Sequence, residues 1–276
     1  MYCGCFCFPK QRPFISTATL TEFELETERE MSSSTATHAY GEPSYWDQRY
    51  SEDPGPFDWY QKYKTLAPLF DVYIRRSHHL LVVGCGNSTL GEELVSDGYL
   101  DVVNIDISSV VVEAMQKKHE DKPELKYIKM DVRDMSAFES SSFDAVIDKG
   151  TLDSLMCGQN AHHNTSKMLE EVGRILKDNG VYILITYGEP SYRLHLLKEL
   201  QLWTINLHVI DRMEKNPEQR AWELTKPLPL SKDGNSIADI IGSNAEVHYI
   251  YVCIKDETLI RQANVNAKPE AEESRS

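Results

Sequence analysis

The chain has 276 residues, of which 26% are charged and 41% hydrophobic, enough for one folded α/β domain with a substantial core. Its formal net charge is −14 and Lys and Arg form no cluster, so we expect no nucleic-acid partner. No apolar run approaches the ~20 residues of a membrane span. An acidic surface suits a basic protein substrate, although acidity can equally serve solubility alone. The isolated Cys85, Cys157 and Cys253 are typical of reduced thiols. We therefore expect a cytoplasmic monomer that contacts no membrane.

Residues 1–40 are predicted to be a disordered leader. The stretch opens with Cys3-Gly4-Cys5-Phe6-Cys7, whose one-residue spacing does not match zinc ligands, and no metal site is expected. Alternating acids from Glu22 to Glu30 argue against an organelle transit peptide. A low-complexity Ser/Thr run follows, from Ser32 to Thr37, and Met31 offers an alternative start.

Order is expected to begin in an aromatic-rich stretch, Tyr45 to Tyr50 (YWDQRY). After Pro54-Gly55-Pro56, residues Phe57 to Arg76 have apolar side chains at helical spacing, interrupted at Pro68. Aromatic residues in such a pattern are more often core than ligand contacts. On the pattern alone, that interpretation would apply to Trp46, Tyr50 and Trp59.

A strand, a glycine turn and a helix start come next. The apolar run Leu80 to Val83 leads into Gly84-Cys85-Gly86-Asn87-Ser88, and Thr89 to Asp97 has a helical pattern. Glycines allow positive φ and close approach of a ligand, while Asn87 or Ser88 can cap the helix. The dinucleotide fingerprint G-x-G-x-x-G/A is incomplete and the P-loop string is absent. The turn therefore indicates a nucleotide-like cofactor other than a dinucleotide.

A carboxylate follows at the spacing that such a cofactor needs. Asp106 ends the apolar run Val102 to Asp106, 22 residues after Gly84 (106 − 84), close to the ~20-residue spacing at which an acid meets a ribose diol. Ser108 is the expected N-cap of a helix that ends at His119.

Further strands alternate with helices along the chain. We expect strands at Leu125 to Met130, Phe143 to Ile147 and Val181 to Tyr187, and a helix from Thr165 to Leu176. Alternation predicts a parallel sheet that is covered on both faces. Its carboxyl edge, where ligands bind in open α/β sheets, would hold Gly84, Asp106, Asp131 and Asp148.

The C-terminal part completes the predicted sheet. Arg193 to Leu202 is expected to be a helix, and no helix separates the strands Trp203 to Ile210 and Glu246 to Lys255, so these can pair antiparallel. The prediction is an α/β fold with a seven-stranded, doubly wound sheet whose last strand is antiparallel. The domain would span residues 41–257, with an edge insertion at 214–244 and a disordered tail at 258–276.

Several strings resemble class I S-adenosylmethionine-dependent methyltransferases, and within them the methyltransferase-like-13 group. The resemblance covers about Tyr45 to Tyr187 and rests on YWDQRY, DWY, VVGCGNS, NIDISSVVVEAM, MDVRDM, SFDAVIDKGTLDSL and EVGRILKDNGVYI. It implies a Rossmann-like fold and S-adenosyl-L-methionine as cofactor. Val82 stands where the family has an acid, and Ser88 where it has a third glycine, which leaves the contact to the cofactor's amino group unassigned.

The resemblance also assigns cofactor-binding residues. Asp131 can accept from the adenine amino group while the Val132 backbone N–H donates to a ring nitrogen, and aromatic rings can stack on the base or shield a sulfonium. A turn-capping role for Asp131 and a solvated-loop role for Lys149 remain alternatives. The implied cofactor-binding positions are Trp46, Tyr50, Trp59, Gly84, Asp106, Ile107, Asp131, Val132 and Lys149.

The implied activity is methylation of protein lysine, with translation elongation factor 1-alpha as the implied substrate. Catalysis would rest on positioning and dehydration of an amine that must also lose its proton. Asp148 is the expected catalytic residue, ahead of Asp153 in the same DKGTLD loop, and structural capping is the alternative for both. A small-molecule or N-terminal amine acceptor stays open, as does a cofactor-binding pseudoenzyme scaffold. A nicotinamide dehydrogenase is a more distant alternative.

Overall fold

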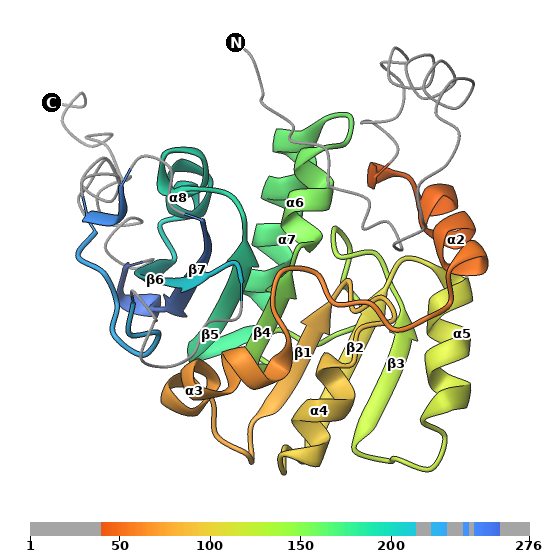
Figure 1. Cartoon of the computed structure of the whole chain (residues 1–276). Coiled ribbons are helices and arrows are strands. Elements are labelled where there is room, and N and C mark those ends of the chain that lie inside the picture. Colours follow the sequence, from red (N-terminus) through yellow and green to blue (C-terminus); the bar gives the residue numbers. More distant parts are fainter. Residues whose placement is uncertain (1–39, 214–221, 231–239, 243–245, 260–276) are drawn as a thin grey trace, which may run out of the picture.

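The computed structural model describes residues 40–213, 222–230, 240–242 and 246–259, which form a seven-stranded sheet with helices packed around it (Figure 1). Strands β1 to β5 run parallel, whereas β7 pairs antiparallel with both β5 and β6. The order across the sheet is β3-β2-β1-β4-β5-β7-β6. The predicted fold class is confirmed, and β7 is inserted between β5 and β6. The strands are β1 (His79–Val83), β2 (Asp101–Asp106), β3 (Leu125–Lys129), β4 (Phe143–Lys149), β5 (Leu176–Thr186), β6 (Trp203–Asp211) and β7 (Val247–Lys255).

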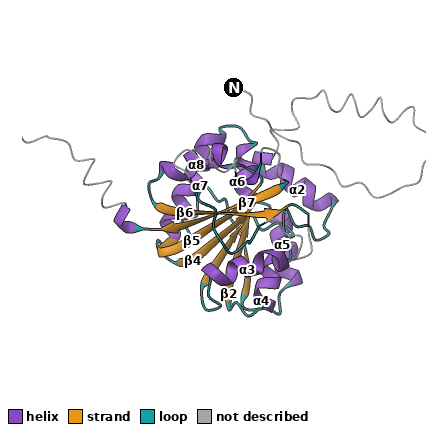
Figure 2. Cartoon of the chain, turned by 60° about the vertical axis from the view of Figure 1, so that its left-hand side comes forward, coloured by secondary structure: helices purple, strands orange, loops and turns teal. Residues whose placement is uncertain are grey.

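Helices cover both faces of this sheet (Figure 2). In β1, Leu81 and Val83 belong to the core cluster that includes α7 residues, while Leu80 and Val82 belong to the cluster that includes α3, α4 and α5 residues. Burial on both faces explains why a parallel strand has a continuous apolar run. The described helices are α2 (Pro43–Glu52), α3 (Tyr63–Tyr73), α4 (Leu90–Ser96), α5 (Ser109–Lys118), α6 (Thr151–Met156), α7 (Ala161–Ile175) and α8 (Pro190–Glu199).

The predicted helix from Phe57 to Arg76 was wrong in its first part. Residues 53–62 form a loop in which Tyr60 has φ +63°, a left-handed conformation that an α-helix does not contain. The helix begins only at Tyr63 and continues through Pro68, with Leu66 and Phe70 fully buried on either side of the proline. Packing therefore holds α3 together across a residue that lacks an N–H donor.

The string DKGTLD (Asp148 to Asp153) was predicted to be a loop, and this prediction was also wrong. Asp148 and Lys149 are the last residues of β4, Gly150 has φ +99°, and α6 begins at Thr151. The string is therefore a strand end joined to a helix start through one left-handed glycine.

Several predicted segments fall partly or wholly outside the described residues. Residues 1–39 of the expected leader lie there, together with Cys3, Cys5 and Cys7, and so do residues 260–276 of the expected tail. Part of the expected edge insertion is described. There, the Leu228 N–H donates to the Leu207 carbonyl at 2.7 Å, next to β6, the last strand in the sheet order. Among the described helices, none combines the length and apolarity needed to span a membrane.

Candidate functional site

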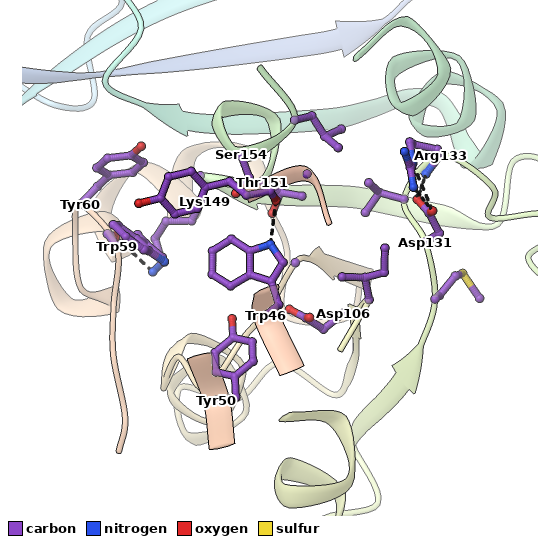
Figure 3. Close-up of a pocket in the computed structure, with 18 residues that line it drawn as sticks. Trp46, Tyr50, Trp59, Tyr60, Asp106, Asp131, Arg133, Lys149, Thr151 and Ser154 are labelled. Carbon is purple, nitrogen blue, oxygen red and sulfur yellow. Dashed lines mark hydrogen bonds and ion pairs between the residues drawn. The ribbon is translucent and has the colours of Figure 1, made fainter. Parts of the chain in front are cut away.

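A cavity of about 770 Å³, partly open to solvent, lies at the carboxyl ends of β1, β2 and β4. Helix α2 and the loop 53–62 contribute further walls (Figure 3). All of the positions predicted to bind a cofactor line this cavity. Sequence reasoning missed the other lining residues, which are Tyr40, Gly41, Tyr60, Met130, Arg133, Gly150, Thr151, Ser154 and Leu155.

The glycine turn lets two other elements approach its backbone closely. Gly84 has φ +55°, and a Cβ placed on it would lie 2.0 Å from Thr151 Oγ1. Gly86 has φ +50°, and a Cβ there would lie 2.6 Å from the hydroxyl oxygen of Tyr50. Thr151 in turn donates its hydroxyl to the Val83 carbonyl at 2.9 Å. The start of α6 and the end of α2 can therefore pack on the turn only because both positions are glycine.

The predicted cap at this turn was wrong in its position, because the N-cap of α4 is Thr89, which makes no side-chain capping hydrogen bond. Ser88 lies one residue earlier. Its hydroxyl accepts from the Leu90 N–H at 3.1 Å, at the first turn of α4. The Asn87 side chain instead donates to the carbonyl of Gly55, so it ties the turn to the loop 53–62.

Asp106 presents a buried carboxylate to the cavity. Its Oδ2 accepts from the Gly86 N–H at 2.9 Å, and its Oδ1 from the Ser108 N–H at 3.0 Å. Burial raises the pKa of Asp106 to about 6, against the lowering effect of its backbone hydrogen bonds. Each carboxylate oxygen has more than one lone pair. The group is thus held rigidly and can still accept hydroxyl donors from a ligand.

Asp131 forms an ion pair within its own turn. Arg133 donates from Nη2 to Asp131 Oδ2 at 2.6 Å, and the Arg133 backbone N–H donates to Oδ1 at 2.9 Å. Partial burial alone would raise the pKa of Asp131, but Arg133 outweighs it and holds the pKa below its ordinary value. The turn-capping alternative therefore describes this carboxylate, which also lines the cavity. Arg133 could have been noticed in the MDVRDM string, two residues after the acid.

Lys149 is buried, so the solvated-loop alternative was wrong. Its Nζ lies 2.9 Å from Asp58 Oδ1 and donates to the Trp59 carbonyl at 3.2 Å. Burial lowers the pKa of Lys149, and the charge of Asp58 opposes that effect. Asp58, which sequence reasoning did not single out, also accepts the hydroxyls of Ser88 and Thr89.

Aromatic side chains form one wall of the cavity. Trp46 and Tyr50 stack with ring centroids 5.8 Å apart, and the Trp46 indole donates to the Tyr40 carbonyl at 2.8 Å. Figure 3 shows this indole projecting from α2 toward the middle of the lining residues. Helix α2 has no buried residue. Trp46, Tyr50 and Trp59 therefore line the cavity, which their pattern alone did not indicate, and Tyr50 also packs against the core cluster that includes α3, α4 and α5 residues.

Asp148, the predicted catalytic residue, is not among the residues that line the cavity. Its side chain is 0% exposed; Oδ1 accepts from the Thr151 N–H at 2.7 Å, and Oδ2 accepts from the Leu152 N–H and the Tyr182 hydroxyl. These contacts place the carboxylate at the N-terminus of α6, where a negative charge is stabilised. Burial raises its pKa to about 7. The geometry fits the capping alternative and does not support the catalytic prediction.

Asp153, the second catalytic candidate, also lies away from the cavity surface. Its Oδ1 is 2.6 Å from Arg193 Nη2 and accepts the Thr186 hydroxyl, while Oδ2 accepts the Tyr60 hydroxyl at 2.7 Å. Asp153 thus anchors the Tyr60 ring. In the described ranges, no group of three or more His, Cys, Asp or Glu side chains could hold a metal ion.

Known proteins share this architecture, and some of them are also similar in sequence. The solved structure from work entitled "Conversion of a Disulfide Bond into a Thioacetal Group during Echinomycin Biosynthesis" matches with a TM-score of 0.53 and 14% identity, over 82% of this chain and 99% of that chain. At that identity the likeness shows the fold alone.

The sequence relatives are closer. EEF1A lysine methyltransferase 4 of Bos taurus is 38% identical over 56% of this chain and 64% of its own length, and that of Mus musculus is 36% identical over 60% and 69%. The eEF1A lysine and N-terminal methyltransferase of Homo sapiens is 34% identical over 63% of this chain, which spans only 26% of that protein. A family model described as "Methyltransferase domain" matches residues 74–251. The chain therefore belongs to the methyltransferase-domain family, whose class I members take a methyl group from S-adenosylmethionine.

Proposed function

We propose that the chain is an S-adenosylmethionine-dependent protein-lysine N-methyltransferase that acts on translation elongation factor 1-alpha in the cytoplasm. The names of the bovine, mouse and human relatives support the substrate. The observation that carries the chemistry is the juxtaposition of Gly84, whose backbone has no room for a Cβ, and the buried Asp106 carboxylate in one cavity.

The cavity residues fit this cofactor. When bound, S-adenosylmethionine supplies an electrophilic methyl group on a positively charged sulfur. Gly84 would let its methionine part approach the backbone, and Asp106 and Ile107 would bind the ribose. Asp131 and Val132 would contact the adenine, while Lys149 would border the site. The rings of Trp46, Tyr50 and Trp59 would shield the sulfonium, because aromatic faces attract cations.

At the side of the cavity where the methyl acceptor would bind, catalysis would rest on positioning the acceptor amine and excluding water from it. Gly150, Thr151 and Ser154 line the cavity at the start of α6, and Tyr60 is fixed there by its bond to Asp153. In the described parts of the chain, the carboxylates among the lining residues are Asp106 and Asp131, and both already accept backbone N–H groups. We therefore infer that the acceptor lysine reaches the site with its proton already lost to water. Asp148 would stabilise α6 rather than remove a proton.

Methyl transfer tests this proposal. Purified elongation factor 1-alpha and a cell extract would be incubated with the enzyme and radiolabelled S-adenosylmethionine, and the labelled residue identified by mass spectrometry. Label on a lysine of elongation factor 1-alpha is the expected result. Label on an N-terminal amine, an activity named for the human relative, or on a small molecule would show that the acceptor is not a lysine of elongation factor 1-alpha. Cofactor binding without any transfer would favour the pseudoenzyme scaffold.

A further inference from the structure

The buried ion pair between Asp58 and Lys149 joins three segments around the cavity. The side chains are 10% and 6% exposed, with Lys149 Nζ 2.9 Å from Asp58 Oδ1. Lys149 ends β4, Asp58 belongs to the loop 53–62, and Asp58 also accepts the hydroxyls of Ser88 and Thr89 at the glycine turn. Burial of both partners makes their charges far less screened than those of a surface pair.

The pair balances the charge at the cavity surface. Within the described residues, the charged side chains that line the cavity are Asp106, Asp131, Arg133 and Lys149. Arg133 is neutralised by Asp131 at 2.6 Å, and Lys149 is neutralised by Asp58, which is not itself a lining residue. Removal of the Asp58 charge would leave a buried ammonium group at the cavity wall without its counter-charge.

Such a change would affect the methyl donor and its product differently. S-adenosylmethionine has a sulfonium, an ammonium and a carboxylate, so its net charge is one positive. Loss of the methyl group converts the sulfonium to a neutral thioether, and S-adenosylhomocysteine has no net charge. The two ligands are otherwise nearly the same in shape. Their relative affinity therefore reports the electrostatic potential in the cavity more directly than either affinity alone.

We propose that Asp58 is a positioning residue that determines the preference for donor over product: its carboxylate cancels the charge of Lys149, so that the cavity accepts a sulfonium. The inference rests on the cofactor part of the proposed function and is independent of the methyl acceptor. It also has a consequence for turnover. Without Asp58, the neutral product competes more strongly, so product inhibition becomes more severe.

The test compares the dissociation constants of the two ligands by isothermal titration calorimetry at about 0.1 M salt, where exposed charges are screened and buried ones much less so. Measurements at pH 6.5 favour the protonated form of Lys149. In Asp58→Asn, the affinity for S-adenosylmethionine should fall roughly tenfold relative to that for S-adenosylhomocysteine, the effect of one charge about 10 Å away at an effective dielectric constant of about 20. Lys149→Met leaves the Asp58 charge unbalanced, so the ratio of the affinity for S-adenosylmethionine to that for S-adenosylhomocysteine should rise. The double variant should return toward the wild-type ratio.

Another ion pair on the same strand provides a matched control. Lys177 Nζ lies 2.9 Å from Asp144 Oδ2, and Asp144 lies near the start of β4, whereas Lys149 ends it. Five residues of strand separate Asp144 from Lys149 by roughly 16 Å, beyond the ~10 Å Debye length at 0.1 M salt. Asp144→Asn removes an ion pair with the same N–O distance but more exposed side chains, 24% and 43%, and should leave the ratio of affinities unchanged.

The ratio is insensitive to partial unfolding, because both ligands are measured on the same preparation and share its active fraction. Equal ratios in the wild type and in all three variants of the Asp58–Lys149 pair would overturn the inference. A shift of the same size in Asp144→Asn would also overturn it, since the effect would then not belong to the cavity. Failure of the wild type to bind either ligand would instead refute the cofactor part of the proposed function.

Discussion

Replacement of Gly84 by alanine tests whether the glycine turn and α6 are as closely packed as the structure indicates. The new Cβ would lie 2.0 Å from Thr151 Oγ1 and 2.9 Å from its Cγ2. Thr151 cannot rotate away without loss of its hydrogen bond to the Val83 carbonyl. A non-glycine residue in the left-handed conformation lowers the free energy of unfolding by about 1–2 kcal/mol. Overpacking by the new Cβ lowers it by about a further 1–3 kcal/mol. We therefore expect Gly84→Ala to lower the free energy of unfolding by about 2–5 kcal/mol.

Urea denaturation of four variants would separate these two contributions. Gly98→Ala is the control for conformation alone, because Gly98 has φ +93° but its nearest neighbour, Arg76 Cδ, would lie 3.9 Å from the new Cβ. It should cost only about 1–2 kcal/mol. Thr151→Ala alone should cost about 1 kcal/mol for its lost hydrogen bond, and in combination it should relieve part of the Gly84→Ala penalty. Strictly additive effects, or equal costs at Gly84 and Gly98, would refute the packing argument.

The other predictions concern ligand binding and stability. Burial raises the pKa of Asp106 to about 6, so below that pH the carboxyl group takes up a proton and accepts ligand hydroxyls less well. Calorimetry should show the affinity for S-adenosylhomocysteine falling up to tenfold per pH unit below pH 6. Asp106→Asn should weaken binding by roughly 1–3 kcal/mol and abolish this pH dependence. Asp148→Asn should lower the free energy of unfolding by about 1–3 kcal/mol, because an amide cannot accept all of its N–H and O–H donors, yet leave ligand affinity unchanged. A chain that starts at Pro43 lacks the carbonyl of Tyr40 that holds the Trp46 indole and should bind S-adenosylhomocysteine more weakly than a chain that starts at Tyr40.

The sheet could be predicted because its central strands, such as β1, β2 and β4, are buried on both faces. The periodicity of a continuous apolar run such as Leu80 to Val83 does not distinguish a strand from a buried helix, but the run is too short for a helix. The final antiparallel strands were predictable for a different reason, since a chain without a crossover helix cannot readily return to a parallel position. Both arguments use only local sequence and the geometry of connections.

The loop 53–62 could not be predicted in this way. Trp59, Tyr60 and Tyr63 follow helical spacing, and nothing local reveals that Tyr60 has positive φ. What fixes the loop is Asp58, whose partners Ser88 and Lys149 lie 30 and 91 positions away in the chain. Such contacts form only once the sheet has brought β1 and β4 together, so a pattern within the loop contains no record of them.

The position of Asp148 follows from strand geometry once its neighbour is placed. Successive side chains in a strand point to opposite faces. Because Lys149 lines the cavity, the adjacent Asp148 must point away from it, toward Tyr182 and the first turn of α6. The sequence alone could name both residues as candidates, but it could not tell which of the two faced the ligand.

This geometry predicts the shape of the pH–rate profile. If no carboxylate removes the lysine proton, kcat/KM should rise about tenfold per pH unit through the range below the ordinary lysine pKa of about 10.4, and Asp148→Asn should keep that slope at a similar rate. If Asp148 were the base, its pKa of about 7 would produce a break near pH 7, and Asp148→Asn would remove the break together with most of the activity. Rates measured from pH 6 to 9 with purified elongation factor 1-alpha, on variants first checked for folding by circular dichroism, distinguish the two cases. A break near pH 7 that disappears in Asp148→Asn would return this residue to the catalytic role predicted from the sequence.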